Sequence, residues 1–123
     1  MQGDPELLEL IRQSVRSVWA LELLLLMRRD RERDWTPESL VSELRASHTL
    51  VADNLPVLES AGLVLSEDGR YRYAPATPLL ETLCGRLEEE YRLRPVAVIN
   101  AIASSPNDRL HKLANAFRLK GDT

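Results

Sequence analysis

The segment 36–75 combines two short helical patterns with two short strand patterns, and this order constrains the fold more than any other feature of the chain. Thr36 and Ser47 are residue types that cap helices, and each precedes apolar residues at helical spacing. We therefore expect helices over residues 37–45 and 48–61, joined by a tight turn.

A β-hairpin is predicted directly after the second helix. The apolar run 63–65 and the run Tyr71-Arg72-Tyr73 flank a Ser-Glu-Asp-Gly sequence. The Asp-Gly pair at 68–69 favours the left-handed conformations of a two-residue hairpin turn. The tyrosines should pack inward, leaving Arg70 and Arg72 on the opposite side of the strand.

The order helix, turn, helix, hairpin resembles the winged helix-turn-helix superfamily of bacterial transcription regulators. The run Leu-Glu-Ser-Ala-Gly-Leu-Val at 58–64 is similar to the LE-x-x-GL-[VI] run that ends the recognition helix in many small repressors. The resemblance covers about 15–74 and matches no single subfamily. It implies a mainly α fold with a short β-hairpin, and DNA binding through the second helix. Winged helices also serve as protein-docking modules, so that alternative stays open.

The 123 residues suit one domain, with N-terminal helices in 1–30, the helix-turn-helix and wing in 36–75, and C-terminal helices in 77–120. The first helix, starting at Asp4, either runs unbroken to Met27 or bends near Ser14. The mixed-charge segment 28–34 reads as a solvated connector.

Beyond the hairpin, a helix should start at about Thr77 and end at Pro95, followed by a short apolar helix over 96–102. A last helix is expected from Ser105; its predicted inner face comprises Leu110, Leu113, Ala114 and Phe117. We expect the apolar terminal helices to form a homodimer interface; the alternative is that they complete a monomeric core.

The expected compartment is the cytoplasm. The acidic N-terminus does not resemble a secretory signal, and the apolar run 18–27 is shorter than the roughly 20 residues that span a bilayer, so no membrane partner is expected. Cys84 is the only cysteine, which excludes an internal disulfide, and it reads as a buried small hydrophobe.

The predicted DNA-binding surface is only weakly basic. The chain has a formal net charge of −3, whereas DNA affinity rests largely on lysines and arginines. The outer face of the second helix offers hydroxyls, a histidine and a carboxylate but no Lys or Arg, the turn before it offers one arginine, and the wing offers two. The candidate residues are Thr36 (through the helix N-terminus that it caps), Arg45, Ser47, His48, Thr49, Asp53, Arg70 and Arg72. Pro56 lies within the second helix, where we expect a kink or a shortened helix.

An enzymatic role finds no support in the sequence. The two histidines, His48 and His111, and Cys84 lie on separate predicted elements, and the chain has no Cys-x-x-Cys, His-x-x-x-His or glycine-rich phosphate loop. We expect no catalytic site, metal or cofactor. The sequence thus predicts a DNA-binding transcriptional regulator; the alternative is a winged helix that binds another protein, as an adaptor or a regulator of the transcription machinery.

Overall fold

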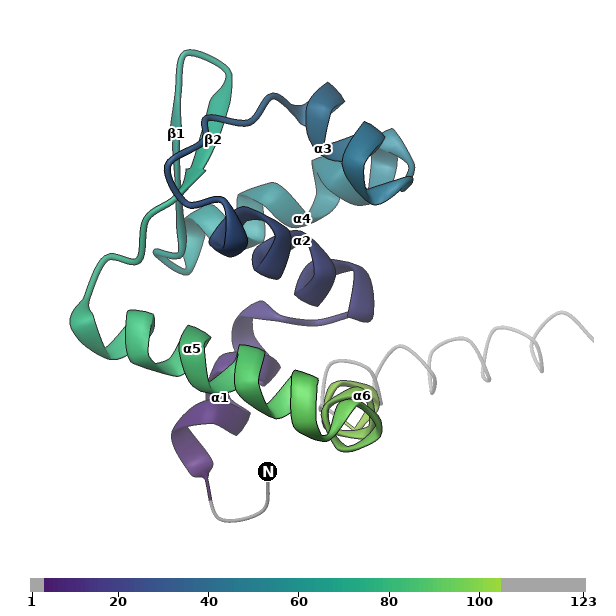
Figure 1. Cartoon of the computed structure of the whole chain (residues 1–123), viewed down its shortest axis with the longest axis vertical. Helices are drawn as coiled ribbons and strands as arrows, with labels where there is room; N and C mark the ends of the chain where they lie inside the picture. Colours follow the sequence, from purple (N-terminus) through teal and green to yellow (C-terminus); the bar gives the residue numbers. More distant parts are fainter. Residues whose placement is uncertain (1–3, 105–123) are drawn as a thin grey trace, which may run out of the picture.

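The computed structural model describes residues 4–104, which form a mainly helical fold with one antiparallel hairpin (Figure 1). In chain order the elements are α1 (Pro5–Ser14), α2 (Val18–Arg29), α3 (Pro37–Leu44), α4 (His48–Ser60), β1 (Val64–Glu67), β2 (Arg70–Tyr73), α5 (Pro78–Leu93) and α6 (Pro95–Ala103). The predicted combination of helices and a short hairpin is confirmed. The helix expected from Ser105, with Leu110, Leu113, Ala114 and Phe117, and His111 lie outside the described residues.

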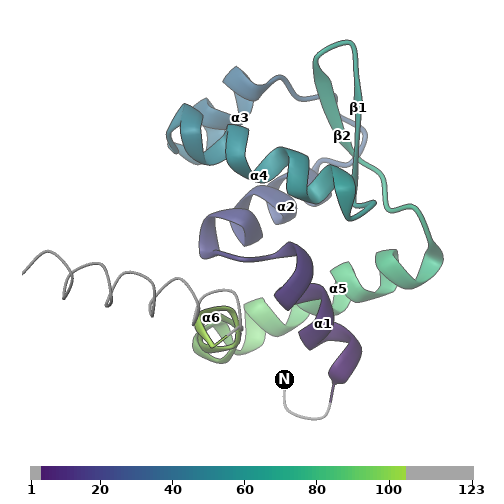
Figure 2. The same cartoon turned by 180° about the vertical axis from the view of Figure 1, so that it is seen from behind.

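The N-terminal region forms two helices, so the predicted bend near Ser14 is the alternative that the structure shows. A new helix begins after Ser17, whose Oγ accepts a hydrogen bond of 3.1 Å from the N–H of Ala20. Because α2 is apolar on nearly every side, it becomes the central helix of the fold. It lies between α4 and the pair α1 and α5 in both Figure 1 and Figure 2.

Helices α3 and α4 form where their capping residues predict them. Thr36 and Ser39 make a reciprocal capping box, with bonds of 3.1 and 2.9 Å, and Ser47 Oγ accepts from the N–H of Leu50 at 3.1 Å. Each helix ends one residue before its predicted end. Of the kink or shortening expected at Pro56, the shortening does not occur, since α4 continues through the proline to Ser60.

The hairpin turns at Asp68-Gly69 as predicted. Its register runs from Val64 opposite Tyr73 to Glu67 opposite Arg70. Asp68 and Gly69 have φ values of 54° and 77°, the paired left-handed conformations of a tight hairpin turn. The sequence analysis missed a third extended segment: Trp35 pairs with Tyr71 through two backbone hydrogen bonds of 2.7 Å each.

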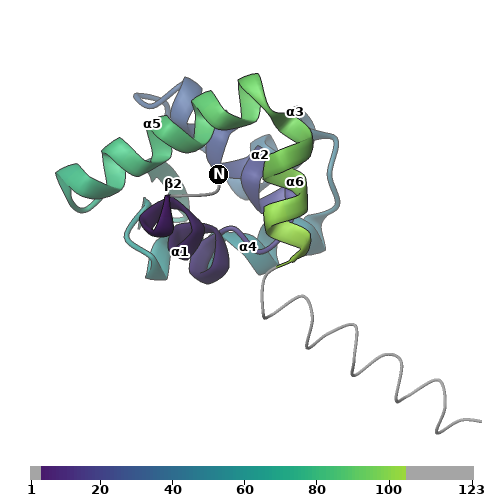
Figure 3. The same ribbon diagram turned by 90° about the horizontal axis from the view of Figure 1, so that it is seen from below.

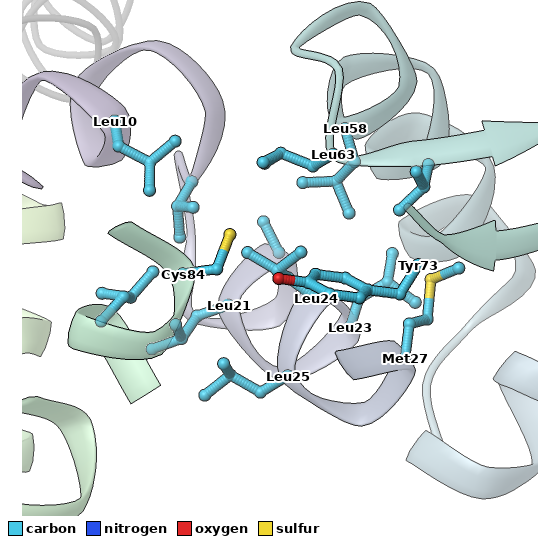
Figure 4. Packing of buried hydrophobic residues seen from close by; sticks show 14 of the residues in the cluster. Leu10, Leu21, Leu23, Leu24, Leu25, Met27, Leu58, Leu63, Tyr73 and Cys84 are labelled. Atoms are coloured by element: carbon cyan, nitrogen blue, oxygen red, sulfur yellow. The ribbon is translucent and has the colours of Figure 1, made fainter. Parts of the chain in front are cut away.

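Helices α1, α5 and α6 form the other half of the molecule (Figure 3). Thr77 caps α5, and Pro95 separates α5 from α6, as predicted. The core between the two halves is built mainly from leucines of α2, together with Leu58, Leu63, Tyr73 and Cys84 (Figure 4). Cys84 is fully buried, which confirms its prediction as a small hydrophobe.

Candidate nucleic-acid interface

One face of helix α4 is buried in the core. No other part of residues 4–104 covers the opposite face. Val51, Leu55 and Leu58 point into the core. The predicted contact residues on the opposite side are all exposed: Ser47, His48, Thr49 and Asp53. Helical spacing therefore separates the apolar anchor from a polar surface.

Three residues near α4 are less available than their type suggests. The hydroxyl of Ser47 accepts the capping hydrogen bond from the N–H of Leu50. Asn54 donates its side-chain amide to the carbonyl of Leu50 at 2.8 Å, so this amide is bonded within its own helix. Thr36 is half-buried and its hydroxyl is occupied in the capping box of α3. Arg45, by contrast, is exposed in the turn between the helices, where it adopts a left-handed φ of 56°.

The second strand of the hairpin alternates as predicted. Arg70 and Arg72 are exposed, while Tyr71 is half-buried and Tyr73 is buried. Glu67 and Asp68 are the carboxylates nearest to the two arginines in the sequence. The ion pair that the structure shows for Arg72 is instead with Asp34, at 4.0 Å.

The outer face of the hairpin is hollowed and carries mixed charge. Asp34, Leu65, Glu67, Asp68, Arg70 and Arg72 line a shallow depression of about 300 Å³. Glu67 lies directly opposite Arg70 in the strand register. This wing surface therefore presents cations with carboxylates beside them.

The whole segment 36–75 is acidic. It contains three arginines (Arg45, Arg70 and Arg72), no lysine and six carboxylates. The segment therefore offers few cations for contacts with phosphates.

A polar cluster beneath the hairpin anchors the wing, and sequence reasoning missed it. Arg28 donates to Glu81 Oε1 at 2.6 Å and to the hydroxyl of Tyr73 at 3.2 Å, and that hydroxyl donates to Glu81 Oε2 at 2.9 Å. Arg31 also donates to Glu81, at 3.1 Å. The cluster joins α2, β2 and α5, so the prediction that residues 28–34 are simply solvated is wrong for Arg28, whose side chain is only 14% exposed.

The electrostatics of this cluster follow from its hydrogen bonds. Burial alone raises the pKa of Glu81, but hydrogen bonds from its three donors outweigh burial and hold the pKa below its ordinary value. Burial is the main reason that the pKa of the Tyr73 hydroxyl is raised. Gly85 makes room for the cluster, because a Cβ at that position would lie 3.1 Å from Arg28 Nη2. No sequence motif indicated this contact, because Gly85 and Arg28 lie on different helices, 57 positions apart in the chain.

Two further arginines of the connector stack on aromatic rings. The Arg33 guanidinium lies 3.8 Å from the centre of the Trp35 ring, and that of Arg31 lies 5.4 Å from the centre of the Tyr73 ring. These contacts hold the connector against the two aromatic residues that border the hairpin.

Residues 4–104 offer neither a metal cluster nor a membrane-spanning helix. No group of three or more His, Cys, Asp or Glu side chains is placed there to hold a metal ion. None of the helices in this part of the chain has both the length and the apolarity needed to cross a membrane. No protein-family model, curated protein or solved structure matches the chain.

Proposed function

We propose that this chain is a winged-helix protein that binds double-stranded DNA and regulates transcription. The observation that carries the proposal is the pairing of two outward surfaces: the polar face of α4 and the hairpin with its two exposed arginines. Figure 2 views the molecule from the side of α4, with the hairpin projecting beside it. In such an arrangement a helix enters the major groove while the hairpin lies along the backbone.

The two surfaces take different roles in this proposal. Ser47, His48 and Thr49, at the N-terminal end of α4, lie nearest the base edges together with Asp53, which can accept a hydrogen bond from a cytosine amino group. Arg45, Arg70 and Arg72 contact phosphates. Thr36 contributes only through the backbone of the α3 N-terminus, because its hydroxyl is already bonded.

The test is a pair of double substitutions measured by DNA titration over a range of salt. Replacing Arg70 and Arg72 with Ala should weaken binding to all sequences and reduce the slope of log K against log salt by about two, roughly one for each lost phosphate contact. The matched control replaces Arg92 and Arg94, which are exposed on the opposite half of the molecule. An unchanged slope in the wing variant would refute the assigned role.

The charge of segment 36–75 favours a second candidate, a winged helix that docks on another protein. Six carboxylates against three arginines repel a duplex but suit a basic partner surface. This candidate predicts little affinity for any duplex at physiological salt, and a protein partner that is lost when His48, Thr49 and Asp53 are replaced.

We further propose that the protein is a homodimer built through α1, α5 and α6. The interface would bury large apolar side chains that are exposed on these helices: Leu8, Leu93, Val96 and Ile99. A two-fold dimer presents two copies of α4 to the two halves of a palindromic site. Sedimentation at micromolar concentration tests this assembly.

A further inference from the structure

A groove of about 510 Å³ lies between α1 and the start of α5, and one end of it reaches the turn after α4. Its lining is largely apolar, with polar groups contributed by α1: Pro5, Glu6, Glu9, Leu10, Gln13, Ser14, Ala61, Leu79, Leu80 and Leu83. The volume and this mixture of apolar floor and few polar groups are typical of sites that bind small molecules.

Ser14 gives the groove a hydrogen-bonding group without a partner. The residue is only 4% exposed, it lines the groove, and its hydroxyl makes no hydrogen bond with any part of residues 4–104. Its oxygen is not one of the fully buried polar atoms that lack a partner, so water reaches it from the groove, and a hydroxyl or amide of a ligand would replace that water.

The charge at the groove is negative. Glu6 is exposed and forms no ion pair within the described part of the chain, whereas Glu9 is shared with Arg12 and Gln13. No Lys or Arg lines the groove. An organic anion would therefore be repelled, and a cation attracted toward Glu6.

We propose that this groove binds a small organic cation with an apolar body, such as an acylated amine. The apolar body lies on Leu10, Leu80 and Leu83, an amide or hydroxyl of the ligand pairs with Ser14, and the ammonium group lies near Glu6.

The position of the groove links it to α4. Ala61, which follows α4 directly, lines the groove. The carbonyl of the next residue, Gly62, accepts from the N–H of Ala76 at 2.7 Å, and a Cβ on Gly62 would lie 3.2 Å from the Cβ of Ala76. The end of α4 is thus packed tightly against the segment leading into α5. A ligand in the groove changes the affinity of α4 for DNA if it binds one arrangement of this junction more tightly than another; this step rests on the proposed function.

Calorimetry of the full chain tests the site without reference to DNA. Octanoylputrescine carries an alkyl chain, an amide and an ammonium group, and N-butyloctanamide lacks only the ammonium. We expect octanoylputrescine to bind about two- to fivefold more tightly than the neutral analogue, and Glu6→Gln to remove that difference. No binding of the amine, or equal binding of both probes, would overturn the proposal.

A matched pair of variants locates the binding site. Leu79 on α5 and Trp19 on α2 are 51% and 41% exposed, but only Leu79 lines the groove. Leu79→Arg should abolish amine binding, and Trp19→Arg should leave it unchanged. The wild-type chain could instead bind no amine and form a dimer that Leu79→Arg dissociates. In that case the groove is an interface between two copies of the chain, and the ligand proposal is wrong.

A DNA titration with and without octanoylputrescine then tests the link to α4. The amine should change the dissociation constant for DNA severalfold in the wild-type chain and not in Leu79→Arg. An amine that binds but leaves DNA affinity unchanged would overturn the regulatory step. A chain that binds no DNA at all would refute the proposed function, while the calorimetry would still decide whether the groove is a ligand site.

Discussion

Replacing Arg28 with Met should loosen the attachment of the wing, because Arg28 connects α2 to both β2 and α5. Met keeps much of the apolar stem but removes the hydrogen bonds of 2.6 Å to Glu81 and 3.2 Å to Tyr73. Removing one partner of a fully buried charge pair costs about 3–5 kcal/mol. The Glu81 side chain is 37% exposed and keeps its bond to Arg31, so solvent screening lowers the expected cost to about 2 kcal/mol.

Urea unfolding at neutral pH measures this cost, and a midpoint lower by about 1 M is expected for a protein of this size. The matched control is Arg92→Met, since Arg92 is exposed and pairs with Glu89 on the same helix. The control should leave the free energy of unfolding nearly unchanged, because solvent screens this exposed pair.

The pH dependence gives a second readout of the same contact. The pKa of Glu81 is lowered in the folded protein, so the stability it contributes is fully present above its unfolded value near 4.5 and is lost as the pH falls through the folded value. The difference between wild type and Arg28→Met should therefore shrink in this acidic range. A cost equal to that of the Arg92→Met control, or a difference that stays constant with pH, would refute the reasoning.

Three further predictions concern the hairpin, the core and the assembly. Gly62 and Gly69 both have a left-handed φ, but of the two only Gly62 has a neighbour within 4 Å of an added Cβ. In urea unfolding, Gly69→Ala should therefore cost roughly 1 kcal/mol, and Gly62→Ala should cost more. Equal costs for the two variants would contradict the close contact at Gly62. Cys84 is buried and burial raises the pKa of its thiol, so it should react with a thiol reagent only after unfolding, and rapid labelling of the native chain would show that the core opens there. Sedimentation should give a dimer that Val96→Asp dissociates; a monomeric wild type would leave the exposed apolar helices without the proposed role.

The features predicted correctly from the sequence depend on local interactions. Thr36, Ser47 and Thr77 cap the helices that follow them, and Asp68-Gly69 sets the hairpin turn, because in each case the decisive hydrogen bond or dihedral lies within a few residues. The alternation along β2 is similarly local, so the exposure of its arginines could be predicted.

The features missed depend on residues far apart in the chain. Arg28 was read as solvated because its neighbours are charged, yet its partners lie 45 and 53 residues away. The pairing of Trp35 with Tyr71 is likewise invisible to periodicity, since a single bridge leaves no alternating pattern. The groove beside α1 combines side chains from three helical regions, none of which carries a motif.

Titration of the full chain against labelled genomic fragments at about 50 and 200 mM salt tests the central claim most directly. The proposed contacts of Arg45, Arg70 and Arg72 predict binding that weakens with salt, with a slope of log K against log salt of about −3 for each protomer. Replacing Thr49 should change which fragments are preferred more than the overall affinity. Absence of binding at the lower salt concentration would contradict DNA recognition and leave protein docking as the function of the exposed α4 face.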